Sequence, residues 1–321
     1  MPMTLLVISD PAAKHLSALR RLPAGVTAIV SNDLDELRTR APEADVILNS
    51  ALKGDLLSGL LPHATQARWI HTLFTGVEAL LTPEVVASSL PLTNGRGVFR
   101  VPLAEWTIGA MIHFSYQFRR LLDQQRAGTW KQFHVEMLHG TTLGIIGYGG
   151  IGSAAAARAK AFGVRVVAIR RRSELSPSDP LVDRFYSPAE LNDMIAVSDH
   201  VLLSTPLTSQ TRGMFGEAQL AAMKPSAVLI NVGRGAVVDE RALVGALQAR
   251  AILGAALDVF EVEPLPEGHP LYALDNVLLS PHCADQVRDF LNLGYDAFFE
   301  NLDRFRKGEV LEYLVDKQAG Y

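Results

Sequence analysis

The sequence predicts an α/β protein with two open parallel sheets. Three observations support this fold class. Short apolar runs alternate with helical segments along most of the chain, one such run leads through a glycine-rich turn into a helix, and 321 residues suffice for two domains. The glycine-rich turn comes only after an earlier set of strands and helices. We therefore expect a doubly wound Rossmann nucleotide-binding domain inserted into a smaller flavodoxin-like α/β substrate domain.

The first 98 residues alternate predicted strands and helices and carry no glycine-rich loop of this kind. The predicted strands are Thr4–Ile8, Val26–Val30, Asp45–Asn49 and Arg68–Thr72, and the predicted helices are Ala12–Arg21, Asp33–Arg38 and the apolar stretch near Leu56–Leu61. Each strand is a short run rich in apolar side chains, which is typical of parallel strands. This part of the chain therefore forms the smaller sheet.

A turn-rich stretch, Asn94–Gly97, is the expected crossing between the two domains. One long helix over Pro102–Arg120 follows, and Pro102 suits its first turn because the missing N–H loses no partner there. The apolar side chains of this helix, Trp106 and Ile112 among them, cover more than one face. Such a helix is either buried or shared with a second subunit, and we expect a homodimer contact there.

Gly147, Gly149 and Gly152 have the spacing G-x-G-x-x-G. The run before them reads as a strand buried on both faces, a helix over Ala154–Phe162 follows, and a second strand covers Val164–Ile169. In this context the first glycine permits a tight turn, the second lets the backbone approach a pyrophosphate, and the third lets the helix pack on the strand. We therefore expect a dinucleotide site at this loop.

From Thr142 onward the sequence predicts six parallel strands with helices between them. They are expected near residues 142–147, 164–169, 199–203, 227–231, 253–258 and 276–279. The last helix, about Gln286–Lys307, is long enough to return to the first domain. We expect a dinucleotide-binding domain over residues 99–286, a substrate domain made of residues 1–98 and 287–321, and an active site in the crevice between them.

Composition argues against several classes of protein. The chain is 48% hydrophobic and 20% charged, and its formal net charge of -4 predicts no binding to nucleic acid or to an anionic membrane. We expect no signal peptide and no membrane span, because no apolar run reaches ~18 residues. The histidine spacing predicts no metal site. The single cysteine, Cys283, is expected to be a small packed residue of a cytoplasmic protein.

Three predicted strands of the second sheet end at ionisable side chains. Arg234 follows one strand, Asp258 and Glu263 follow the next, and His282 follows the last. A guanidinium binds a carboxylate through two parallel hydrogen bonds. An imidazole exchanges a proton near neutral pH, and a neighbouring carboxylate favours its protonated form. Arginine, carboxylate and histidine together are the groups that the reduction of a 2-oxo acid requires.

Longer motifs around these residues resemble one family. GYGGIG, INVGRGAVVDERAL, GAALDVFEVEPLP and SPHCA, in that order, together with TLFTGVEAL and VPLAEWTIGAM, resemble the D-isomer-specific 2-hydroxyacid dehydrogenases, and within them glyoxylate/hydroxypyruvate and 2-ketoacid reductases. The resemblance covers nearly the whole chain. It implies an NAD(P)-dependent oxidoreductase with hydride transfer between the cofactor and a 2-oxo or D-2-hydroxy acid.

The resemblance also implies roles for individual residues. Arg234 would bind the substrate carboxylate and carbonyl, His282 would be the acid/base, and Glu263 would be its carboxylate partner. Asp258 matches an acidic residue near the nicotinamide. The full set of expected substrate contacts is Ala51, Leu52, Phe74, Thr75, Gly76, Arg234 and His282.

The end of the strand Val164–Ile169 bears on the choice of cofactor. In this fold an acidic residue about 20 residues beyond the glycine loop binds the ribose of NAD(H). Here Arg170–Ser173 begins 18 positions after Gly152, and the first carboxylate is Glu174. Guanidinium groups suit a 2′-phosphate, so we expect NADP(H) to be preferred, with NAD(H) as the alternative. The expected cofactor contacts are Gly147, Tyr148, Gly149, Gly150, Ile151, Gly152, Arg170, Arg171, Arg172, Ser173, Thr205, Pro206, Thr211, Val232, Gly233, Arg234, Asp258 and His282.

The sequence leaves two alternatives open. One is a member of the same family that acts on another acid, such as phosphoglycerate, formate or phosphite, although Glu263 stands where formate enzymes have glutamine. The other is a nucleotide-sensing, corepressor-like interaction protein on the same fold, which would keep similar arginine, glutamate and histidine positions. Side chains that line the pocket choose the acid, and Leu52, Phe74, Arg100 and Met137 are the candidates.

Overall fold

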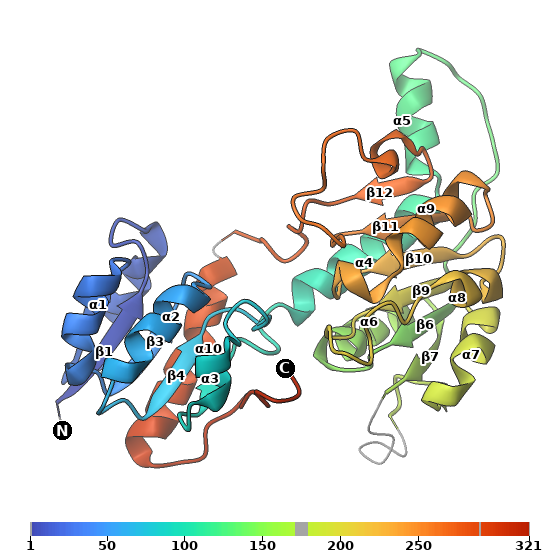
Figure 1. Ribbon diagram of the computed structural model, residues 1–321. Coiled ribbons are helices and arrows are strands. Elements are labelled where there is room, and N and C mark those ends of the chain that lie inside the picture. Colours follow the sequence, from blue (N-terminus) through green and yellow to red (C-terminus); the bar gives the residue numbers. More distant parts are fainter. Residues whose placement is uncertain (1, 171–178, 289, 321) are drawn as a thin grey trace. The chain divides into compact units, whose positions relative to one another are not determined.

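The computed structural model describes residues 2–170, 179–288 and 290–320 (Figure 1). The chain divides into two compact units, one made of Met1–Phe99 and Arg288–Tyr321 and the other of Arg100–Val287. Each unit contains one sheet, and the strands that pair within each sheet are parallel. The predicted α/β fold class is thus confirmed.

The first unit is built on a five-stranded sheet with the order β2-β1-β3-β4-β5, which is the flavodoxin-like order. Its elements are β1 (Met3–Ile8), η1 (Lys14–Arg21), β2 (Val26–Ser31), α1 (Leu34–Arg40), η2 (Ala41–Glu43), β3 (Val46–Asn49), α2 (Gly54–Leu60), η3 (Leu61–His63), β4 (Trp69–Thr72), α3 (Pro83–Ala87), β5 (Leu92–Thr93) and α10 (Phe290–Lys307). The four strands predicted in this unit are all present. Side chains alternate along β1, so that Leu6 and Ile8 pack with α1, α2 and α3 while Leu5 and Val7 pack with η1 and α10.

Three elements of the first unit differ from the prediction. The segment expected as a regular helix over Ala12–Arg21 is the 3-10 helix η1. Its apolar side chains at Leu16, Leu19 and Leu22 are three residues apart, and this spacing aligns them on one face of a 3-10 helix, packed on the core. Helix α3 and strand β5 were not predicted. They have five and two residues, too few to show a period.

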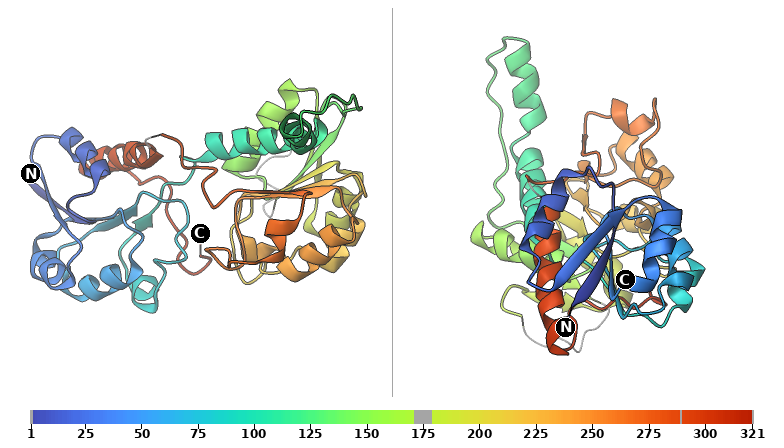
Figure 2. Two further views of the ribbon diagram at one scale, coloured as in Figure 1. Left: turned by 90° about the horizontal axis from the view of Figure 1, so that it is seen from above. Right: turned by 90° about the vertical axis from the view of Figure 1, so that its left-hand side faces the viewer.

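The second unit is built on a seven-stranded sheet with the order β12-β11-β10-β9-β6-β7-β8, a doubly wound Rossmann arrangement. Its elements are α4 (Arg100–Ser115), α5 (Phe118–Arg126), β6 (Thr142–Ile146), α6 (Gly150–Ala161), β7 (Arg165–Ile169), β8 (Arg184–Tyr186), η5 (Pro188–Glu190), α7 (Leu191–Val197), β9 (His200–Leu203), α8 (Glu217–Ala222), β10 (Val228–Asn231), η6 (Gly235–Val237), α9 (Glu240–Gln248), β11 (Gly254–Leu257), η7 (Pro270–Ala273) and β12 (Val277–Leu279). Figure 2 shows α4 and α6 on one face of this sheet and α9 on the other. The seventh strand, β8, escaped prediction because it has three residues at the sheet edge.

The single helix predicted over Pro102–Arg120 is two helices. Gln117, between α4 and α5, has a left-handed backbone with φ 51°. The chain that returns after α5 bonds to the end of α4, where Glu136 N–H donates to the Ser115 carbonyl (2.9 Å) and the Gln117 side chain donates to the His134 carbonyl (3.0 Å). A contact distant in sequence therefore accompanies the break. Within its own unit helix α4 packs against α6, and its expected contact with a second subunit stays a prediction.

Many exposed apolar side chains of the second unit lie just before α5, on α5 and in the segment after it, and α5 with this segment stands out from the sheet (Figure 1). They are Tyr116, Phe118, Leu121, Leu122, Trp130, Val135 and Met137. Trp130 is 95% exposed.

None of the helices in the described ranges is both long enough and apolar enough to cross a membrane.

Candidate active site

The loops that follow β6, β9, β10, β11 and β12 meet at one edge of the second sheet, because these parallel strands are neighbours. Each loop carries one or more of the residues that sequence analysis singled out. Close contacts connect these loops in sequence, beginning at the glycine loop and ending at His282.

The glycine loop has the backbone that a pyrophosphate site requires. Gly147 has φ 96°, and a Cβ added there would lie 2.8 Å from the Thr205 backbone nitrogen. A Cβ at Gly152 would lie 2.9 Å from Ile145 Cγ2, so this glycine lets α6 pack on β6. A Cβ at Gly149 or Gly150 would meet no atom within 4 Å, which leaves exposed backbone at the start of α6. This open helix N-terminus is suited to phosphate.

Thr205 joins the glycine loop to the arginine loop. It contacts Gly147, and a Cβ added at Gly233 would lie 2.7 Å from its carbonyl oxygen. Among the described residues, its buried hydroxyl has no hydrogen-bond partner. Thr211 closes the same loop by donating to the Pro206 carbonyl at 2.7 Å. The glycine loop therefore has a buried, unpaired hydroxyl beside it within the described structure.

Arg170 follows β7 directly. Its guanidinium carbon lies 5.8 Å from the ring centre of Tyr148 and 5.9 Å from that of Phe185. Within the described part of the chain, its Nη1 is buried without a hydrogen-bond partner. Arg171, Arg172 and Ser173 lie outside the described residues. The unpaired donors of Arg170 and Thr205 and the open glycine backbone fit a phosphorylated dinucleotide cofactor.

Arg234 lies in a loop that the Asn231 side chain holds. Asn231 Oδ1 accepts from Gly233 N–H and its Nδ2 donates to the Arg234 carbonyl, both at 3.1 Å. The Arg234 guanidinium donates to the Gly233 carbonyl at 2.7 Å. A Cβ at Gly235 would lie 1.8 Å from the Phe260 carbonyl carbon, so the arginine loop is packed against the loop after β11.

His282 and Glu263 are in direct contact. His282 Nδ1 lies 2.7 Å from Glu263 Oε2, and the other carboxylate oxygen accepts from Phe260 N–H at 2.9 Å. Their side chains are 44% and 35% exposed. With Glu263 ionised, Nδ1 carries the proton in this contact, and Nε2 is the imidazole atom that can exchange a proton with a substrate.

Asp258 holds the loop that carries His282. Its buried Oδ1 accepts from the Ser280 hydroxyl (2.5 Å) and from the N–H groups of Cys283 (2.9 Å) and Ala284 (3.0 Å). Its carbonyl accepts from His282 N–H at 2.9 Å, and His282 has φ 50°. The expectation that Cys283 is packed is wrong, because its backbone is bonded inward while its side chain is exposed.

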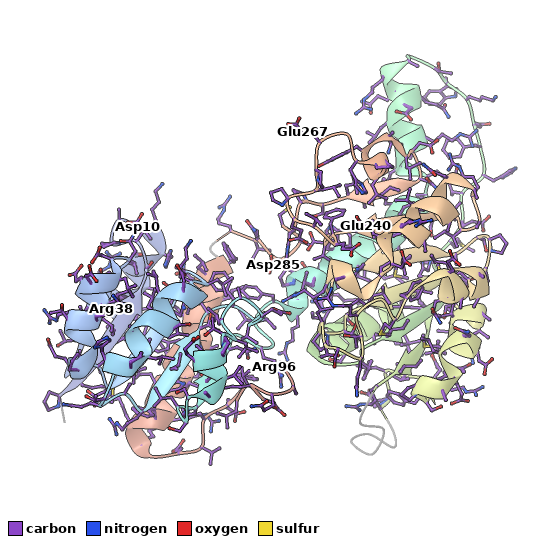
Figure 3. The ribbon with its side chains drawn as sticks, viewed as in Figure 1. Asp10, Arg38, Arg96, Glu240, Glu267 and Asp285 are labelled. Atoms are coloured by element: carbon purple, nitrogen blue, oxygen red, sulfur yellow. The ribbon has the colours of Figure 1, made fainter. Side chains whose placement is uncertain are left out.

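Two further residues of this edge had no predicted role. Burial raises the pKa of the Asp285 carboxyl, and nearby His282 and Arg234 oppose this effect while Asp258 adds to it. Glu240, on α9, places Oε1 3.3 Å from His269 Nε2, and its Oε2 accepts from Glu261 N–H at 3.1 Å. It therefore contacts the chain on either side of Glu263. Asp285 and Glu240 are labelled in Figure 3. The sequence spacing of Asp285 and Glu240 relative to the motifs indicates no role for either residue.

The expected substrate contacts of the first unit lie in the loops after β3 and β4. They are Ala51, Leu52, Phe74, Thr75 and Gly76. Leu52 has φ 52°, and Asn49 Oδ1 accepts from the backbone N–H groups on either side of it at 3.3 Å. The Thr75 hydroxyl donates to the Gly95 carbonyl at 3.0 Å. Neighbouring parallel strands thus bring these five residues to one edge of the first sheet.

The remaining pocket candidates lie elsewhere in the second unit. Arg100 begins α4, and Met137, which is 67% exposed, lies on the segment after α5. As for metals, the described residues contain no group of three or more histidine, cysteine, aspartate and glutamate side chains that could hold an ion.

Replacing Gly235 with alanine is expected to destabilise the protein by about 3 kcal/mol or more, because the new Cβ would overlap the Phe260 backbone. Urea unfolding measures this change. Gly245→Ala in α9 is the matched control, since its Cβ would meet no atom within 4 Å. That variant should gain up to about 1 kcal/mol from helix propensity. Equal stability of the two variants would contradict the contact between the loops.

Sequence comparison finds relatives of the whole chain. The family profile described as "D-isomer specific 2-hydroxyacid dehydrogenase, NAD binding domain" matches residues 108–284. A glyoxylate reductase of Korarchaeum cryptofilum is 34% identical over 312 residues, which cover 89% of this chain and 90% of that protein.

Solved structures with the same fold also cover the whole chain. A D-isomer specific 2-hydroxyacid dehydrogenase from Xanthobacter autotrophicus, in complex with NADPH and MES, superposes with a TM-score of 0.85 at 28% identity over 100% of each chain. An NADPH-dependent glyoxylate/hydroxypyruvate reductase from Sinorhizobium meliloti, in complex with NADP and sulfate, gives 0.86 at 25% identity over 99% of this chain and 100% of that one.

Proposed function

Because this chain belongs to the D-isomer-specific 2-hydroxyacid dehydrogenase family, and is therefore an NAD(P)-dependent oxidoreductase, we propose that it reduces a 2-oxo acid to the D-2-hydroxy acid with NADP(H). We assign His282 as the acid/base and Arg234 as the residue that binds the substrate carboxylate. The observation that carries this proposal is the 2.7 Å contact of His282 with Glu263, in an edge that also holds Arg234.

In this mechanism His282 moves the proton. During reduction, protonated His282 donates from Nε2 to the carbonyl oxygen of the substrate as that oxygen becomes a hydroxyl. During oxidation, neutral His282 accepts the same proton. Glu263 holds Nδ1 and so keeps the ring oriented, and Asp258 holds the loop beneath it. Reduction therefore requires the protonated imidazole, and oxidation requires the neutral one.

Arg234 provides the positive charge. Its guanidinium would bind the carboxylate with parallel hydrogen bonds and polarise the carbonyl at C2. When bound, the nicotinamide cofactor supplies the hydride. The residues that would hold it are the glycine loop, Thr205 and Arg170, whose unpaired donors support this assignment. The contacts proposed for Ala51, Leu52, Phe74, Thr75 and Gly76, and those of Pro206, Thr211 and Val232 with the cofactor, stay predictions.

Replacing Glu263 with glutamine is expected to lower reductive turnover about tenfold, a part of the 10²–10⁴-fold that a general acid contributes. The amide keeps the size of the side chain but loses the charge with which Glu263 accepts from Nδ1 and orients the ring. Steady-state rates between pH 5 and 9 measure this, with the exposed Glu267→Gln as control. Turnover like that of the parent protein across this range would contradict the pairing.

We also propose that the protein forms a homodimer through α5 and the segment after it. The exposed apolar side chains there, with Trp130 at 95%, support a contact with a second copy, because monomers rarely expose such patches. Light scattering should give twice the chain mass, and the double substitution Leu121→Glu and Leu122→Glu should give a monomer. Leu314→Glu, at an exposed leucine of the first unit, is the control. A monomeric parent protein would contradict the proposal.

The deciding experiment follows NADPH and NADH oxidation with acids from glyoxylate and hydroxypyruvate to pyruvate, 2-oxoisocaproate and phenylpyruvate. We expect turnover with NADPH, and the trend with side-chain size will identify the acid. Faster turnover with NADH would overturn the cofactor preference and leave the assigned chemistry intact. Tight cofactor binding with no turnover on any acid would favour the corepressor-like alternative.

A further inference from the structure

We propose that the side chain of Tyr148, in the glycine loop, is a positioning residue for cofactor specificity. Its ring supports the Arg170 guanidinium, and its hydroxyl holds the Asp179 carboxylate so that this carboxylate does not pair with Arg170. The inference rests on the proposed role of Arg170 at the 2′-phosphate of NADP(H). The proposed role of Arg170 does not involve the side chains of Tyr148 and Asp179, which this inference adds.

The Tyr148 side chain is buried, although the glycines that follow it are exposed. It is only 6% exposed, and its ring packs edge-on against Phe185 at 5.5 Å between centroids. Its hydroxyl donates to Asp179 Oδ2 at 2.8 Å. Burial raises the pKa of Tyr148, and Asp179 raises it further, so the hydroxyl stays protonated and remains a donor. The Tyr148 hydroxyl is therefore used by Asp179 and not by a cofactor phosphate.

Two aromatic rings support Arg170. The rings of Tyr148 and Phe185 lie 5.8 and 5.9 Å from its guanidinium carbon, and a ring face attracts the cation without offering it a lone-pair acceptor. Its Nη1 is buried and unpaired among the described residues. A buried unpaired donor is costly unless a ligand completes it. An anion with several oxygen acceptors, such as a phosphate monoester, would do so.

Asp179 is the carboxylate that could block this arrangement. It shares Tyr148 with Arg170, and the charges of both act on the tyrosine, Asp179 raising its pKa and Arg170 lowering it. Two bonds hold Asp179 instead, from the Tyr148 hydroxyl to Oδ2 and from Leu181 N–H to Oδ1 at 2.9 Å. If the hydroxyl were absent, Oδ2 would lose its Tyr148 donor and could pair with a cation such as Arg170 instead. A carboxylate there would neutralise Arg170 and repel a 2′-phosphate.

Three variants test this device through dissociation constants for NADPH and NADH, measured by fluorescence titration without substrate. Tyr148→Phe keeps the ring and loses the hydroxyl, so we expect NADPH to bind about tenfold more weakly, as for one charge-assisted hydrogen bond lost, and NADH to be nearly unchanged. Asp179→Asn should bind NADPH at least as tightly as the parent protein. The double variant should recover the parent affinity for NADPH, because it has no carboxylate at position 179 that could neutralise Arg170.

The outcomes separate this inference from the proposed function. If the double variant stays as weak as Tyr148→Phe, or if NADPH and NADH weaken equally, the hydroxyl only supports the fold and the inference fails. If the parent protein and Arg170→Leu bind NADPH alike, the role of Arg170 itself fails. Thermal unfolding of each variant, with and without 2′,5′-ADP as a cofactor fragment, provides a second readout. The fragment should stabilise the parent and the double variant more than Tyr148→Phe.

Discussion

Replacing His282 with alanine is expected to lower kcat for reduction by about 10³-fold, within the 10²–10⁴-fold that general acid catalysis contributes. The loss arises because no other group would donate the proton that the carbonyl oxygen requires. Affinity for NADPH, measured by titration, should change little. Steady-state rates at saturating substrate and cofactor measure the effect.

The backbone at His282 calls for a second variant. Its φ of 50° is left-handed, which asparagine tolerates better than alanine. His282→Asn should therefore preserve the loop held by Asp258 and still lose turnover. His63→Ala, at an exposed histidine of the first unit, is the control and should retain full activity. Turnover of His282→Asn within tenfold of the parent protein would remove His282 from the mechanism.

Replacing Arg234 with lysine is expected to lower kcat/KM by about 10²–10³-fold, the cost of one preorganised donor aimed at developing charge. Lysine keeps the charge but cannot make two parallel hydrogen bonds to a carboxylate. The KM for the 2-oxo acid should rise and kcat should fall, since in the proposed mechanism the arginine both binds the carboxylate and polarises the carbonyl. Initial rates over a range of substrate concentrations separate the two effects.

The exposed Arg38→Lys in the first unit is the control for Arg234→Lys and should behave as the parent protein does. A ketone that lacks the carboxylate provides a further comparison, because its slow reduction should be less sensitive to the substitution. If the lysine variant reduces the 2-oxo acid normally, then another cation binds the carboxylate and the assignment is wrong.

Local patterns were enough to predict most of the fold. Gly147, Gly149 and Gly152 indicate a dinucleotide site through their spacing together with the strand before them and the helix after them, because a tight turn, an open backbone and a close helix–strand contact each require a glycine at a set position. The strands of both sheets are apolar runs that burial on two faces dictates. The short elements α3, β5 and β8 carry too few residues for any such pattern.

The candidate site was predictable only in part. Strand ends pointed to Arg234, Asp258 and His282, and family resemblance paired Glu263 with His282. No local pattern shows that Asp258 holds the histidine loop, or that Asp285 and Glu240 belong to the same edge. Those relations join loops that come together only when the strands pair.

The sequence by itself determined the α/β class, the glycine loop, the ionisable residues at the strand ends and the family, because each depends on residues close together in the chain. Tertiary structure alone decided which donors stay unpaired at Arg170 and Thr205, where the helix after Pro102 breaks, and how the loops of Gly235 and Phe260 interlock. These features depend on atoms that are distant in sequence. Their energies arise from packing and burial, which exist only once the sheets have formed.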